Sequence, residues 1–362
     1  MTRIRAPLGL IGFLTLVGAI ETGVQRYRLR LEPTVVSGYR FASEAVRETS
    51  ECEVLCFGDS LVKFGVYPRA LVGRDHRAYN LACPAARPPW TSILFQRALD
   101  AGARPSAVVV DFKPTLAQTD PLLDAGELSE VLTAGEILDL AVTARDPVGL
   151  ARIGVHKLLP SFHARDGLRA LASSTIGRRP RRRGHELIPL WRRNWEENLG
   201  AWVVDKNPDA GRPARFADET IANALGPWEC HPLNAASIRR FLETASRAGI
   251  PVYWLVPPIL PRLQAERDRR GDDARFSTFV RSIAADYTDL VVVDGRRSGY
   301  PASVFIDGSH LDFEGAHTFT VELAAILRAH RRLNSLPRLV TLPPFRSRIP
   351  TEALAARRRA TE

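Results

Sequence analysis

The sequence predicts an α/β fold: a three-layer sandwich around a parallel, about five-stranded sheet, with a mainly helical central insertion and an N-terminal membrane segment. Short apolar runs alternate with segments of helical spacing in both halves of the chain. The runs AVVVDF and LVVVDG are continuously apolar up to their aspartate, which is typical of strands buried on both faces. With 362 residues, 45% of them hydrophobic, the chain is long enough to bury such a core.

The elements of this sandwich follow one another along the chain. Strands are expected at 53–58, 78–82, 107–112, 251–257 and 290–295. Helices are expected at 90–101, 234–249, within 262–286 as one long charged helix, and at about 313–332 behind an N-cap at Asp312. Strand signals are missing between about 120 and 230. The expected organisation is a signal anchor or signal peptide (1–24), a linker (25–49), the first half of the domain (50–120), a helical insertion or cap (121–229), the second half (230–335) and a basic tail (336–362).

The N-terminus carries the only uncharged apolar run of its length, APLGLIGFLTLVGAI at 6–20, behind Arg3 and Arg5. This pattern predicts a signal anchor or a cleaved signal peptide and an exported body in the cell envelope. Fifteen helical residues span about 22 Å, less than the roughly 30 Å of a bilayer core, so the span extends to Val24 or the segment is cleaved. A buried N-terminal helix is the alternative.

Charge and cysteine content narrow the classes of partner. The excess of Lys and Arg over Asp and Glu, 50 against 40, gives a net charge of +10 and favours anionic partners. No groove-reading or base-stacking motif accompanies the basic run at 178–183, so nucleic acid is a poor fit. The cysteines show no C-x-x-C spacing, and we expect no metal or other cofactor. Cys83 and Cys230 could pair, or remain buried thiols.

Two segments carry the residues of a nucleophilic site. Ser60 follows the apolar run EVLCF, behind Gly58 and Asp59, and the loop VFIDGSHLDF places Asp307 three residues before His310. A serine hydroxyl needs a base to remove its proton, and the base needs an acceptor to hold its tautomer. Both segments follow predicted strands, and the carboxyl ends of parallel strands meet at one edge of a sheet. GDS alone would also suit an ordinary turn, since all three residues favour turns.

With these residues in place, the chain resembles the SGNH/GDSL hydrolase family over roughly 50–120 and 230–335. GDSL at 58–61 is similar to the first block of that family, YNLACPA at 79–85 to the second, and Asp307-x-x-His310 to the last. The resemblance implies a flavodoxin-like sandwich, with Ser60 as nucleophile, His310 as general base and Asp307 as its partner.

The family's oxyanion hole takes its donors from the nucleophile's own N–H, a glycine N–H in block two and an asparagine side chain in block three. The resemblance therefore places the backbone N–H groups of Ser60 and Ala85 in this hole. VVVDFKPTL stands at block three without the asparagine, and Thr115 occupies its place with Lys113 just before it. One donor is thus shorter or missing, and each such donor can contribute about 2.7 to 4 kcal/mol to transition-state stabilisation.

This departure, the N-terminal run and the insertion resemble the membrane-anchored SGNH-like O-acyltransferases of cell-envelope polysaccharides more than small secreted esterases. The resemblance implies ester hydrolysis or acyl transfer, such as acetyl transfer, through an acyl-Ser60 intermediate. The expected substrate is an envelope glycan or a small acyl ester, with a membrane-bound acyltransferase as partner. Water and sugar remain alternative acceptors. The rival from another class is a non-catalytic glycan-binding or assembly protein.

Aromatic residues in the insertion offer a surface for sugar rings. Trp191 and Trp195 follow the arginine run, and aromatic faces suit sugars while guanidinium groups suit anions. We therefore select Trp191, Trp195 and Lys113 as substrate-binding candidates. The alternative is that tryptophans at helical spacing belong to the core and that the arginines form a solvated loop.

Overall fold

A computed structural model describes residues 8–26, 34–72, 77–159, 161, 184–204, 226–330 and 337–349. The chain forms two compact units, Met1–Ser37 with Leu122–Leu190, and Gly38–Pro121 with Trp191–Glu362. The second unit holds the sheet and all the site residues selected from the sequence. The arginine run at 178–183 and the tail beyond residue 349 lie outside the described residues.

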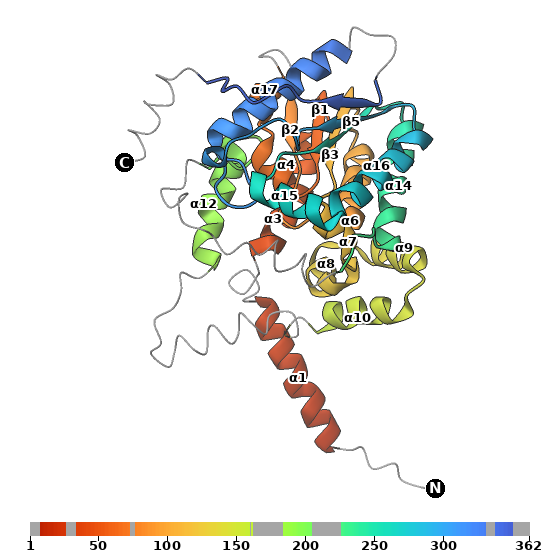
Figure 1. Cartoon of the computed structure of the whole chain (residues 1–362). Coiled ribbons are helices and arrows are strands. Elements are labelled where there is room, and N and C mark those ends of the chain that lie inside the picture. Colours follow the sequence, from red (N-terminus) through yellow and green to blue (C-terminus); the bar gives the residue numbers. More distant parts are fainter. Residues whose placement is uncertain are drawn as a thin grey trace. The chain divides into compact units, whose positions relative to one another are not determined.

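The sheet has six strands, all parallel, in the order β2-β1-β3-β4-β5-β6 (Figure 1). The predicted α/β fold with a parallel sheet is confirmed, and all five expected strands are present. The sixth strand corrects the expected number of about five, and it lies in the segment expected to be a tail. It is only three residues long, and it is mostly exposed, unlike the other five strands, which are almost wholly buried. The strands are β1 (Val54–Phe57), β2 (Ala78–Asn80), β3 (Ala107–Asp111), β4 (Val252–Val256), β5 (Leu290–Asp294) and β6 (Leu339–Thr341).

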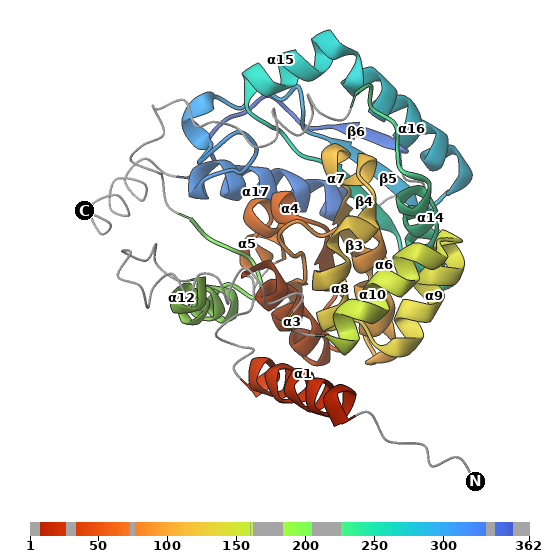
Figure 2. The same ribbon diagram turned by 90° about the horizontal axis from the view of Figure 1, so that it is seen from below.

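Helices cover both faces of the sheet, as Figures 1 and 2 show. On one face, Cys56, Val109 and Leu255 belong to the same buried cluster as Phe319 of the last helix. On the other, the ring of Phe57 contacts aromatic side chains of two helices. The first face carries α4 (Ser60–Gly65), α5 (Pro68–Leu71) and α17 (Phe313–His330), and the second carries α6 (Pro88–Asp100), α14 (Pro232–Arg247) and α16 (Asp272–Asp286).

Two segments differ from the sequence prediction. The expected single helix within 262–286 is two helices, α15 (Pro261–Arg270) and α16, because Gly271 adopts a left-handed φ of 73° between them. The expected linker at 25–49 contains α3 (Thr34–Ala45), followed by the short 3₁₀ helix η1 (Val46–Glu48). The ring of Tyr39 in α3 lies 4.9 Å from that of Trp90, so this part of the chain belongs to the core.

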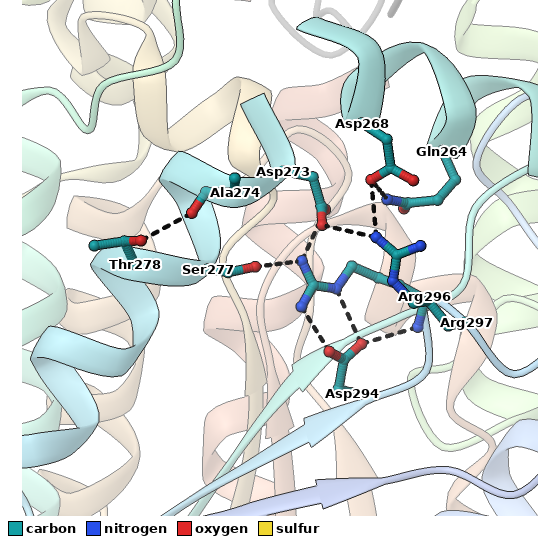
Figure 3. Close-up of polar contacts among 9 residues, drawn as sticks. All are labelled: Gln264, Asp268, Asp273, Ala274, Ser277, Thr278, Asp294, Arg296 and Arg297. Atoms are coloured by element: carbon teal, nitrogen blue, oxygen red, sulfur yellow. Dashed lines mark hydrogen bonds and ion pairs between the residues drawn. The ribbon is translucent and has the colours of Figure 1, made fainter. Parts of the chain in front are cut away.

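An ion-pair network ties α15 and α16 to the end of β5 (Figure 3). The Arg296 guanidinium donates to Asp294 at 2.6 Å and to Asp273 of α16 at 2.7 Å. The neighbouring Arg297 donates to Asp268 of α15 at 3.0 Å. Burial opposes ionisation of Asp273, but the charges and hydrogen bonds of its neighbours, Arg296 first among them, together lower the pKa of this carboxyl. The network therefore fixes both helices beside the carboxyl end of the sheet.

The described residues of the expected insertion form helices and no strand, as the sequence predicted. Thr133 and Glu136 form a capping box at the start of α9, and Asp146 caps α10. These helices are η2 (Pro121–Asp124), α8 (Ala125–Val131), α9 (Ala134–Ala144), α10 (Pro147–Leu158) and α12 (Gly184–Glu197).

The N-terminal apolar run forms α1 (Leu8–Arg26), whose side chains Phe13 and Leu16 are exposed. Among the described residues, no helix combines the length and the apolar character that a membrane crossing requires. All four cysteines are free thiols, so Cys83 and Cys230 do not form a disulfide.

Candidate active site

The turn after β1 places Ser60 at the first position of α4. Gly58 has a φ of 123°, and a Cβ atom on it would overlap the Asp111 side chain at the end of β3, so only glycine fits. Asp59 caps α4 by accepting the Leu61 N–H at 2.7 Å. The backbone N–H of Ser60 lies at the first position of α4, so it has no carbonyl partner within the helix. The turn therefore presents both the hydroxyl and the N–H of Ser60 at the edge of the sheet.

A second loop, between β5 and α17, holds the histidine. Asp307 Oδ1 accepts the backbone N–H groups of Ser309 at 2.8 Å and His310 at 2.9 Å. An antiparallel bridge between Phe305 and Leu311 closes the loop. Because the Asp307 carboxylate is fixed by its own loop, it can orient the imidazole without a contact from another element.

The two loops bring the three expected side chains into one hydrogen-bonded line. His310 Nδ1 lies 2.6 Å from Asp307 Oδ2, and His310 Nε2 lies 2.7 Å from Ser60 Oγ. Burial opposes ionisation of Asp307, but the hydrogen bond to His310, together with the other hydrogen bonds of this carboxyl, lowers its pKa to about 2. An ionised carboxylate only accepts, so Nδ1 carries the imidazole proton and Nε2 accepts the Ser60 hydroxyl proton. This geometry suits a serine nucleophile with its base and orienting acid.

Two expected oxyanion residues lie in the segments that follow β2 and β3, at the carboxyl end of the sheet. Ala85 adopts a φ of 58°, in the left-handed region that favours glycine. Thr115 is the second residue of α7 (Pro114–Gln118), and Lys113 is the N-cap of this helix. Lys113 and Thr115 line the same cavity as Leu61 and Ser309, the neighbours of the nucleophile and the base.

The structure separates the two tryptophan candidates. Trp195 is only 6% exposed, and its indole N–H donates to the Tyr79 hydroxyl at 2.9 Å. These contacts favour the core interpretation for Trp195. Trp191 is partly exposed, and its ring centroid lies 4.6 Å from that of Trp202, edge to face. Trp191 therefore keeps a surface on which a ligand can pack.

An aromatic stack beside His310 was missed by the sequence analysis. The Phe64 ring centroid lies 4.7 Å from that of His310, and on Phe64 the Trp202 ring is stacked at 5.5 Å with an angle of 8°. The backbone N–H of Trp202 donates to the Lys63 carbonyl at 2.9 Å, and the backbone N–H of Phe313 donates to the Val204 carbonyl at 3.0 Å. Residues 202–204 thus connect α4, which carries the nucleophile, to the start of α17 behind the base. The only signal in the sequence is the i, i+4 spacing of Ser60 and Phe64.

Lys63 is a buried lysine underneath this segment. Its ammonium group donates to the Gly200 carbonyl and lies 2.9 Å from the Trp195 ring centroid. Burial lowers the pKa of Lys63 well below that of an exposed lysine. Because the amine interacts with a carbonyl and an aromatic face, it joins α4 to the end of α12 and lies inside the core.

Two buried acids lie next to each other behind the nucleophile. Asp111 Oδ1 accepts the Asp59 backbone N–H at 2.9 Å, and the remaining oxygen, Oδ2, of each carboxyl is buried without a hydrogen-bond partner in the described part of the chain. Burial raises the pKa of both carboxyls, and for Asp111 the neighbouring Asp59 charge raises it further, well above the usual range. The surroundings of the pair therefore favour the protonated form of Asp111 over its ionised form.

Comparison with known proteins adds no identity to this geometry. No family model matches the chain, and no curated protein does so either. In the ranges that the structure describes, no group of three or more His, Cys, Asp and Glu side chains could hold a metal ion. The resemblance to SGNH/GDSL hydrolases therefore rests on the three sequence blocks.

The acid pair predicts how Asp111→Asn changes the pH dependence of stability. A raised pKa in the folded state contributes stability that is complete below about pH 4 and is lost as the pH rises through the folded pKa. The amide of this variant keeps an oxygen that can accept the Asp59 N–H, and the substitution removes one acid. From pH 4 to pH 8, the variant should therefore gain stability relative to the wild type. Urea unfolding followed by tryptophan fluorescence measures this difference.

The matched control for this experiment is Asp286→Asn. Asp286 is exposed and pairs with Arg239 at 2.7 Å, so its removal should leave the slope against pH nearly unchanged. If the stability difference between Asp111→Asn and wild type is the same at pH 4 and pH 8, the raised pKa of Asp111 is refuted.

Proposed function

We propose that the chain is an SGNH/GDSL-type serine esterase or O-acyltransferase, which forms an acyl-Ser60 intermediate on a cell-envelope glycan or a similar exported substrate. The observation that carries the proposal is the continuous line from Ser60 Oγ through the imidazole of His310 to the ionised Asp307. The strand order β2-β1-β3-β4-β5 supports it, because flavodoxin-like sheets have this order and bind ligands where β1 and β3 diverge. Ser60 follows β1 at that point.

In the acylation half, His310 Nε2 removes the Ser60 proton while Oγ attacks the carbonyl carbon of the donor ester. The carbonyl oxygen becomes an oxyanion, which the N–H groups of Ser60 and Ala85 and the groups of Lys113 and Thr115 would stabilise. The intermediate collapses, the bond to the leaving alkoxide breaks, and this alkoxide takes the proton from His310. Asp307 accepts the Nδ1 proton throughout and stabilises the imidazolium.

In the second half, His310 takes the proton of an acceptor hydroxyl, and the acceptor oxygen attacks the acyl carbon. The acyl group leaves Ser60, which regains its proton from His310. Water as acceptor gives hydrolysis, and a sugar hydroxyl gives transfer, so both reactions use the same residues. The partly exposed Trp191, together with the +10 charge of the chain, supports an anionic glycan as acceptor.

The N-terminal segment supports a place at the envelope membrane. The exposed apolar side chains of α1 would lie in lipid, and the body would face outward, where a membrane-bound acyltransferase could supply the acyl group. The proposal includes no nucleic acid and no metal or cofactor.

Replacement of the nucleophile tests the reaction. Ser60→Ala should abolish labelling by a fluorophosphonate probe and any trapped acyl adduct, because among the described residues Ser60 Oγ is the hydroxyl that contacts His310 Nε2. The melting temperature should change by less than a few degrees, since the hydroxyl is partly exposed. Intact-protein mass spectrometry and a thermal scan measure both.

Asp307→Asn should keep the fold and lower the labelling rate by at least about a hundredfold, since the amide favours the wrong imidazole tautomer.

The rival function gives a different result in the same experiment. Thr115 in place of the family's asparagine is the observation that favours a glycan-binding or assembly protein without catalysis. Wild-type protein that does not label, yet binds an envelope polysaccharide, would replace the enzymatic proposal. An adduct that persists without Ser60 would reassign the nucleophile.

The third oxyanion donor can be tested at Thr115. Thr115→Asn would aim an amide N–H at charge that exists only in the transition state, so kcat should rise more than KM falls. The expected gain is about tenfold to a hundredfold with a p-nitrophenyl ester, below the full value of a donor whose loop was built for it. Lys113→Ala is measured beside it. Loss of activity in Lys113→Ala with no change in Thr115→Asn would assign the donor to Lys113.

Membrane attachment is tested by deletion of residues 1–24. Full-length protein should sediment with membranes and leave them only in detergent, whereas the shortened chain should stay in the supernatant. Protease added to intact cells reports the orientation. Full-length protein in the supernatant would refute attachment, and a fully protected body would refute export.

A further inference from the structure

A cavity opens beside the nucleophile and the base. Its volume is ≈ 70 Å³, and its lining includes Leu61, next to Ser60, and Ser309, next to His310. Thr115, the expected oxyanion residue, lines it as well. The cavity is therefore lined by the chain neighbours of Ser60 and His310, whereas Ser60 and His310 themselves lie outside its lining.

Most of the accessible lining of the cavity is apolar and comes in part from the two helices beside the carboxyl end of the sheet, while Gln118, Arg267 and Arg270 add polar groups. Leu263 of α15 is 6% exposed, Phe276 of α16 is 1% exposed, and Trp228 contacts the Phe276 ring at 5.2 Å. The Trp228 indole N–H already donates to the Pro114 carbonyl at 2.8 Å, so it presents carbon atoms to the cavity. These walls suit a group without hydrogen-bond donors or acceptors.

A sugar ring does not suit this cavity. Every hydroxyl of a pyranose buried here would need a polar partner, and an unmade hydrogen bond in a buried site is costly. Three acids belong to the lining, and each already has a partner. Asp111 accepts the Asp59 N–H, Asp272 pairs with Arg270 at 2.9 Å, and Glu266 pairs with Arg269. An aliphatic chain, in contrast, gains from each methylene that leaves water.

The size of the cavity limits the length of the chain. A cavity of about 150 Å³ holds the six carbons of benzene, so ≈ 70 Å³ accommodates about three carbons. The Arg296 and Arg297 network holds α15 and α16, so the walls cannot separate easily to admit more (Figure 3). An acetyl group, with one carbon beyond the carbonyl, would leave most of the cavity empty.

We propose that this cavity is the acyl subsite, and that the acyl group on Ser60 is a short aliphatic chain of about four carbons, longer than acetyl. The inference rests on the proposed acyl-Ser60 chemistry and adds its substrate class. Leu263 is the residue that determines chain length. No charged group of the donor enters the cavity, so the leaving group departs on the other side of Ser60.

The experiment measures kcat/KM of the full-length protein for p-nitrophenyl acetate, butyrate, hexanoate and octanoate. Two further buried methylenes should favour butyrate over acetate by about fifteenfold, or about fourfold for each. Octanoate should be poorer than butyrate, because its end cannot enter. In Leu263→Trp the indole fills the cavity, and the butyrate-to-acetate ratio should fall to about one. In Leu263→Ala the optimum should move to hexanoate.

The control is Leu339→Trp, the same substitution at a leucine of β6 that is 56% exposed and outside the cavity. It should keep the wild-type ratio. Fluorophosphonate labelling of Ser60 in each variant shows that the triad is intact, and Leu263→Ala serves if Leu263→Trp does not fold. The acyl subsite is refuted, while the proposed function stands, if all labelled variants have the wild-type butyrate-to-acetate ratio or if acetate is the best substrate of the wild type. If Ser60 neither labels nor turns over any ester, both proposals fail.

Discussion

The close contact between Gly58 and Asp111 determines where the reactive groups lie. β1 and β3 are parallel neighbours, with Phe57 opposite Val110, so the residues that follow them meet at the edge of the sheet. The missing Cβ of Gly58 makes room for the Asp111 carboxyl, which accepts the Asp59 N–H. This contact sets the direction of the turn and hence of Ser60. A larger residue at 58 would have to separate the two strands at the point where both are fully buried.

The acids around Ser60 have opposite ionisation tendencies, and their surroundings explain why. Asp307 accepts two backbone N–H groups and an imidazole N–H, so its charged form is favoured despite partial burial. Asp111 is buried against another acid, so its neutral form is favoured. One residue type therefore supplies an ionised acceptor for His310 and, in Asp111, a carboxyl of raised pKa in the wall of the adjoining cavity. The distinction lies in hydrogen-bond donors, which Asp307 obtains from the turn of its own loop.

The sequence predicted those parts of the molecule whose signal is local. β1, β3 and β5 are continuous apolar runs, and the spacing of Asp307 and His310 reflects one short loop, so both were recognisable. β6 has three partly exposed residues and owes its pairing to β5, which no local pattern encodes. The stacking of Trp202 on Phe64 and the burial of Trp195 bring together residues more than a hundred positions apart. Gly271 was the one local signal that was underused, since a glycine inside a charged helical pattern favours a break.

In the proposed reaction, the two sides of the Ser60–His310 pair have different tasks. The cavity beside Leu61 and Ser309 would hold the acyl chain, and Phe64 covers one face of the His310 ring, backed by Trp202. In this proposal both groups would exclude water from the acyl carbon and the base, and would thereby lengthen the life of an acyl-Ser60 intermediate. Ser60 and His310 remain partly exposed along the edge between them, and there an acceptor hydroxyl can reach Nε2. The balance between hydrolysis and transfer therefore depends on how well an acceptor displaces water from that edge. Trp191, partly exposed and in contact with Trp202, is placed to favour an acceptor with a flat apolar face such as a sugar ring.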